Sequence, residues 1–85
     1  MKTVWKFPIT DMCAEIKAPG LCFPRFVAAQ AGTMCVWAEV KPGEPDRSCV
    51  VTVHGTGHPI GDDERYIGSL MDGPFVWHAY ATALD

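Results

Sequence analysis

The residues best suited to chemistry in this chain surround one glycine-rich segment. Two glycines flank a threonine directly after a run of alternating apolar residues, and a histidine follows. Backbone N–H groups in such turns can bind an anion, a nearby guanidinium can hold a phosphate through two hydrogen bonds, and a tyrosine ring can stack on a base. We therefore predict a pocket for a small anionic ligand, such as a nucleotide. The predicted ligand-binding residues are Gly55, Thr56, Gly57, His58, Arg65 and Tyr66.

The same segment has a structural interpretation. It is not a phosphate-binding P-loop, because neither the Lys-Ser/Thr ending nor a following helix is present. A corner between two strands also uses glycine, because glycine tolerates a positive φ. Both interpretations stay open at the level of the sequence.

Three histidines form a second group with chemical potential. His54, His58 and His78, with Asp62 or Asp63, would suffice for a zinc ion if the fold brought them together. However, the first two span a strand end and a loop, so their spacing does not ensure convergence. The alternative is that His78 is a half-buried strand residue and that His58 bonds within its own loop. We predict no metal and no cofactor.

Patterns for nucleophilic catalysis are weak. Ser48 and Ser69 lie in strand-like stretches without a GxSxG elbow. Cys49 could form a thiolate pair with a histidine, but strand alternation puts it on the opposite face from His54. We therefore predict that the protein is not an enzyme.

Charge and cysteine usage narrow the class of protein. Seven Lys and Arg stand against ten Asp and Glu, and the basic residues are scattered, so we expect no long nucleic acid as a partner. None of the four cysteines forms a CxxC pair. The N-terminal stretch has no apolar run of signal-peptide length. We therefore expect four free thiols, a cytoplasmic protein and no membrane association.

The elements that must position these residues are short strands. β-branched and aromatic stretches alternate with turn signals such as Pro19-Gly20 and Asp72-Gly73, and 85 residues suffice for one domain. We predict an all-β fold, a small antiparallel sandwich or barrel of six to seven strands, as a single domain over residues 1–85. The predicted strands cover residues 3–7, 15–18, 25–30, 34–41, 48–54, 66–71 and 75–80.

The aromatic residues exceed what one small core needs. Alternation puts Phe75 and Trp77 on one face of the last strand and Tyr80 on the other, so both faces are largely apolar. Small proteins with two apolar strand faces often bury one against another subunit. We predict a homo-oligomer with Trp5, Trp77 and Tyr80 at its interface. A closed barrel whose core absorbs these rings is the alternative.

Three pieces of the chain, MKTVWKFPI, GTGHPI and YIGSL…GPFVWHAY, occur in an order that resembles a family of short proteins encoded by tailed bacteriophages and prophages. The resemblance implies a viral protein acting in the host bacterial cytoplasm, and it implies no reaction. We therefore expect a counter-defence protein that sequesters a small nucleotide-derived immune signal without catalysis. The alternatives are a protein inhibitor of a host defence factor, such as a nuclease or CRISPR effector, and a small metal-dependent hydrolase that uses the three histidines.

Overall fold

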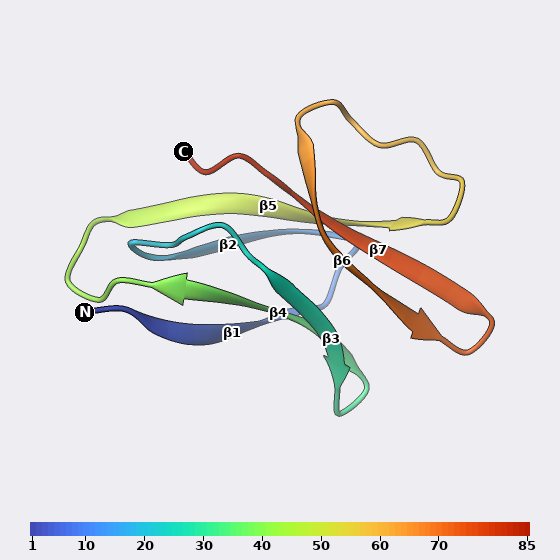
Figure 1. Ribbon diagram of the computed structural model, residues 1–85, viewed down its shortest axis with the longest axis horizontal. Coiled ribbons are helices and arrows are strands. Elements are labelled where there is room, and N and C mark those ends of the chain that lie inside the picture. The colour runs from blue at the N-terminus through green and yellow to red at the C-terminus, as the bar shows by residue number, and fades with distance from the viewer.

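Seven strands and their connections make up the computed structural model, which describes all residues from Met1 to Asp85 (Figure 1). The strands are β1 (Thr3–Ile9), β2 (Cys13–Pro19), β3 (Phe26–Gln30), β4 (Thr33–Val40), β5 (Asp46–Gly55), β6 (Glu64–Asp72) and β7 (Phe75–Thr82). They form a three-stranded sheet in the order β1-β4-β3 and a four-stranded sheet in the order β2-β5-β7-β6. All neighbouring strands are antiparallel. The predicted all-β fold is confirmed, and no helix is long and apolar enough to cross a membrane.

Strand alternation creates the core between the two sheets. In β5, Cys49, Val51 and Val53 are buried, whereas the residues between them are half-buried. Val36 and Val40 of β4 are fully buried from the opposite sheet. The core comprises Ile9, Ile16, Ala18, Leu21, Val27, Val36, Ala38, Val40, Cys49, Val51, Val53, Ala79 and Ala81. Every member is a small or aliphatic residue, so the aromatic rings lie around this core or on the surface.

β2, β5 and β6 are longer at both ends than predicted, and β1 continues past the proline that was predicted to end it. β1 continues through Pro8 to Ile9, although a strand ending before the proline was expected. Because β1 is an edge strand, proline can occupy a position there without removing a hydrogen bond from the sheet. Ile9 is thereby carried into the core at the end of the strand.

The segment between β2 and β3 moves the chain from one sheet to the other. The Cys22 N–H donates to the carbonyl of Glu39 at 2.9 Å, and the Arg25 N–H donates to that of Trp37 at 3.2 Å. Leu21 and Pro24 are fully buried along this path. This segment therefore covers one side of the core and brings β3 alongside β4.

The two sheets approach closely where β3 lies beside β6 (Figure 1). A Cβ at Gly68 would lie 2.8 Å from Cγ1 of Val27, so only glycine fits there without displacement. The pairing of β6 with β7 is irregular between Tyr66 and Gly68, which is a bulge. This contact fixes the position of β6, the strand that carries several of the polar residues described next.

Candidate functional site

The glycine-rich segment forms a tight turn at the end of β5. The His58 N–H donates to the carbonyl of Gly55 at 3.1 Å, and Gly57 has a φ of +89°. A four-residue turn with a positive φ at its third residue is of type II, which favours glycine at that position. Gly57 therefore has the structural role that the sequence suggested, a positive φ in a turn that follows a strand.

The His58 ring folds back onto its own turn. Its Nδ1 accepts a hydrogen bond from the N–H of Gly55 at 3.3 Å. A Cβ at position 55 would lie 3.0 Å from Cε1 of this ring, so glycine leaves room for the imidazole. The interpretation in which His58 bonds within its own loop is confirmed.

A pocket of about 310 Å³ lies beside the turn. One wall is formed by the stacked rings of Phe75 and Trp77, whose centroids are 5.8 Å apart and whose planes differ by 26°. Phe75 is 58% exposed, so a second planar group could reach its ring. The lining residues are Gly55, Thr56, His58, Pro74, Phe75, Val76 and Trp77.

The other predicted ligand-binding residues lie elsewhere. The Arg65 guanidinium is 4.3 Å from the centroid of the Phe23 ring, a cation–π contact. The hydroxyl group of Tyr66 is 2.6 Å from Oγ of Ser69. Neither Arg65 nor Tyr66 lines the pocket beside the turn, and no lysine or arginine does.

A chain of hydrogen bonds connects the turn to β6 across the outer face of the four-stranded sheet. Thr56 Oγ1 is 2.9 Å from Nε2 of His78, and Nδ1 of the same ring is 2.7 Å from Oγ of Ser69. A neutral imidazole donates through one nitrogen and accepts through the other, so His78 can bridge two hydroxyl groups. The chain ends at the hydroxyl group of Tyr66.

Part of this chain has the form of a nucleophile beside a base, Ser69 with His78. The second nitrogen of His78 contacts the hydroxyl group of Thr56 and not a carboxylate. The group that orients and stabilises the imidazolium in a serine hydrolase is therefore replaced by a neutral partner. The arrangement favours structural bridging and polar recognition.

His54 and Glu64 form a second polar pair on this face. Nε2 of His54 is 2.7 Å from Oε1 of Glu64, and Oε2 of Glu64 accepts the Gly61 N–H at 2.8 Å. The hydrogen bond from His54, followed by that from Gly61, lowers the pKa of Glu64 below its ordinary value. The pair holds the connection between β5 and β6 against the sheet, a role that the sequence analysis missed.

The three histidines do not form a metal site. His54 bonds to Glu64, His58 bonds to its own turn, and His78 lies between two hydroxyl groups. No three His, Cys, Asp or Glu side chains are grouped as a bound metal ion would require. This geometry gives no support to the metal-dependent hydrolase.

The cysteines are all free, and Cys49 is buried. Burial first, and then the charge of Asp85, raises the pKa of the Cys49 thiol to about 11. At neutral pH this side chain is a protonated thiol, and the thiolate is the nucleophilic form. Cys49 therefore acts as a small core residue.

The three predicted interface residues lie on different surfaces. Trp5 is 42% exposed on the edge strand β1. The Trp77 indole N–H donates to Oδ2 of Asp72 at 3.4 Å, and Tyr80 packs edge-on against Tyr66, with ring centroids 5.3 Å apart. They do not form one patch, and oligomerisation stays a prediction.

Comparison with known proteins places the chain in a family. No curated protein and no solved structure is similar enough to match it. One family model, described as a domain of unknown function (DUF7352), matches residues 1–85, which is the whole chain. The chain therefore belongs to the DUF7352 family.

Proposed function

We propose that this protein is a non-catalytic binding protein that captures a small ligand with a planar ring in the pocket beside the glycine turn. The observation that carries the proposal is the meeting of the stacked Phe75 and Trp77 rings with Thr56 and His58 around one pocket of about 310 Å³. That volume is at the small end of the range for ligand sites, about 300–1,000 Å³.

The chemistry of the pocket favours a nucleotide or a related molecule. The exposed face of Phe75 can stack on a base, an interaction worth about 1–3 kcal/mol. The hydroxyl group of Thr56, Nε2 of His58 and the backbone N–H groups of Thr56 and Gly57 can supply hydrogen bonds for a phosphate or a sugar, because the N–H groups of Gly55 and His58 are already bonded within the turn. Because Arg65 stacks on Phe23, these groups and not its guanidinium would meet the anion.

The resemblance to proteins of tailed bacteriophages extends the proposal to biology. In that setting the protein would act in the host bacterial cytoplasm and sequester a nucleotide-derived immune signal. Capture of this kind is stoichiometric and needs no catalytic group. GTGHPI, one of the pieces that carry the resemblance, contains the turn that borders the pocket.

The proposal is tested by thermal unfolding with 5′-AMP, a cyclic dinucleotide and inorganic phosphate. A ligand at ten times its Kd stabilises the folded state by about 1.4 kcal/mol, which raises the Tm of a domain of this size by roughly 6–11 °C. Phe75→Leu keeps an apolar side chain but loses the ring, so we expect the affinity to fall about 5- to 150-fold.

The matched control is Phe26→Leu. Phe26 is 59% exposed and lies 5.5 Å from the Trp37 ring on the other sheet, so it has the same type of surroundings as Phe75 without the glycine turn. We expect this variant to bind as the unmodified protein does. Equal losses in both variants, or no stabilisation by either nucleotide, would contradict the proposal. If the same protein then captured a host defence protein from a bacterial lysate, the alternative function, inhibition of a host defence factor, would be favoured.

A further inference from the structure

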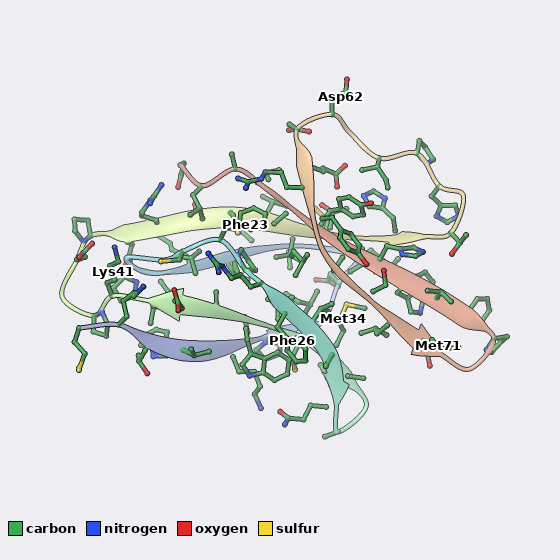
Figure 2. All side chains as sticks on the ribbon, viewed as in Figure 1. Phe23, Phe26, Met34, Lys41, Asp62 and Met71 are labelled. Atoms are coloured by element: carbon green, nitrogen blue, oxygen red, sulfur yellow. The ribbon has the colours of Figure 1, made fainter.

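A second and larger pocket opens between the two sheets at the end of the molecule where three connections meet. It has a volume of about 450 Å³ and is bordered by the β1–β2 connection, the β3–β4 hairpin and the β6–β7 hairpin. Figure 2 shows Met34 and Met71 at this end, on β4 and β6 respectively. Nothing in the proposed function uses this pocket.

The interior of this second pocket is apolar. Ile9, Met34 and Leu70 contribute flexible or branched aliphatic side chains, and Trp77 contributes an aromatic wall, whereas Met71 is exposed at the edge of the opening. Methionine adapts its shape to the group that it contacts, because it is unbranched and its sulfur is polarizable. The pocket is therefore suited to an alkyl or aryl group and has the volume of a small-molecule site.

The rim of the pocket is acidic. Asp11 and Asp72 are the only charged residues in the lining. Neither forms an ion pair, because the two ion pairs of the protein are Lys2–Glu39 and His54–Glu64. The nearest polar partner of Asp72 is the Trp77 indole N–H, 3.4 Å from Oδ2. Two carboxylates without cationic partners thus border one apolar opening.

We propose that this pocket binds a small amphipathic cation, an alkyl or aryl ammonium compound. The apolar body packs among Ile9, Met34 and Leu70, and the ammonium group lies between the carboxylates of Asp11 and Asp72. The Trp77 ring adds a cation–π contact. Anions of the same shape bind more weakly, because the only charged side chains in the lining are the two carboxylates.

The test uses three probes with the same phenyl group: 2-phenylethylammonium, 2-phenylethanol and 3-phenylpropionate. Binding to the full chain is followed by amide chemical-shift changes in a ¹⁵N-labelled sample. We expect the ammonium compound to bind most tightly, with the largest shifts at Leu70 and Asp72, and the carboxylate to bind most weakly. Added salt should weaken the binding of the ammonium compound, because salt screens exposed charges.

Variants separate the charge from the cavity. Asp11→Asn with Asp72→Asn removes both carboxylates and keeps their size, and we expect the affinity for the ammonium compound to fall about 2- to 30-fold. Asp62→Asn with Asp63→Asn changes the net charge equally at a loop outside the pocket, and we expect no loss. Neutral 2-phenylethanol should bind all three proteins alike.

Three results would overturn the proposal. They are equal binding of the carboxylate and the ammonium probes, unchanged affinity after removal of both pocket carboxylates, and shifts confined to the glycine turn. A nucleotide should shift Gly55 and His58, whereas the ammonium compound should shift Leu70 and Asp72. Binding of the ammonium compound can therefore be confirmed or refuted whether or not a nucleotide binds beside the turn.

Discussion

Gly68→Ala tests whether the contact between β6 and β3 fixes the distance between the sheets. The new methyl carbon would lie 2.8 Å from Cγ1 of Val27, and ordinary van der Waals contact begins at 3.4 Å. Valine cannot easily turn away, because its branched Cβ restricts χ1. The strands must therefore separate, or Val27 must leave its packed position in the core.

The expected loss of stability is moderate. Overpacking of this kind costs about 1–3 kcal/mol. Replacing glycine by alanine recovers about 0.4–1 kcal/mol, because it restricts the unfolded chain. The net loss is about 0–2.6 kcal/mol, which lowers the Tm of a domain of this size by up to roughly 21 °C.

Urea unfolding of four proteins measures the contact directly: the unmodified protein, Gly68→Ala, Val27→Ala and the double variant. Val27→Ala alone should cost about 1.5–3 kcal/mol, through lost burial and the cavity that it leaves. In the double variant the new methyl group enters the space that Cγ1 vacated, so only the effect on the unfolded chain remains, and we expect this variant to be about 0.4–1 kcal/mol more stable than Val27→Ala. Additive effects of the two substitutions, or a Gly68→Ala protein more stable than the original, would refute the reasoning.

Two further predictions follow from the pKa shifts. The pKa of Glu64 lies below its ordinary value of 4.5 in the folded protein, so its stabilising contribution is complete above about pH 4.5 and is lost as the pH falls through the folded-state pKa. The free energy of unfolding of the protein should therefore exceed that of Glu64→Gln at pH 7, and the gap should narrow toward pH 3; a constant gap would contradict this. A thiol reagent at pH 8 should modify the exposed Cys13 in the folded protein and the buried Cys49 only after unfolding, as peptide mass mapping would report. Equal labelling rates would count against burial of Cys49.

Much of the fold was predictable because local signals agreed with the tertiary structure. The alternation of apolar residues in β5 predicted which of its residues are buried, and Asp72-Gly73 predicted the hairpin between β6 and β7. The continuation of β1 through Pro8 was not predictable, because it depends on β1 being an edge strand, which is a property of the whole sheet. The order β2-β5-β7-β6 likewise follows from the packing of distant segments.

The candidate site was predictable only in part. Gly55, Thr56 and His58 do border one pocket, but the turn was combined with Arg65 and Tyr66 because they follow closely in the sequence. Adjacent residues in a strand point to opposite faces, so Arg65 and Tyr66 could not both face the same ligand once both were in β6. Extending the predicted strand two residues toward its start would have revealed this conflict.

Trp77 determines which variants can assign a function to either pocket. Its ring stacks on Phe75 in the pocket beside the turn and lines the apolar pocket between the sheets. Replacing it would alter both pockets and the half-buried packing of β7 at once, so a loss of binding in Trp77→Ala could not be attributed to one site. Phe75 and Leu70 each line only one of the two pockets. A loss of binding after substitution of Phe75 therefore identifies the pocket beside the turn, and a loss after substitution of Leu70 identifies the pocket between the sheets.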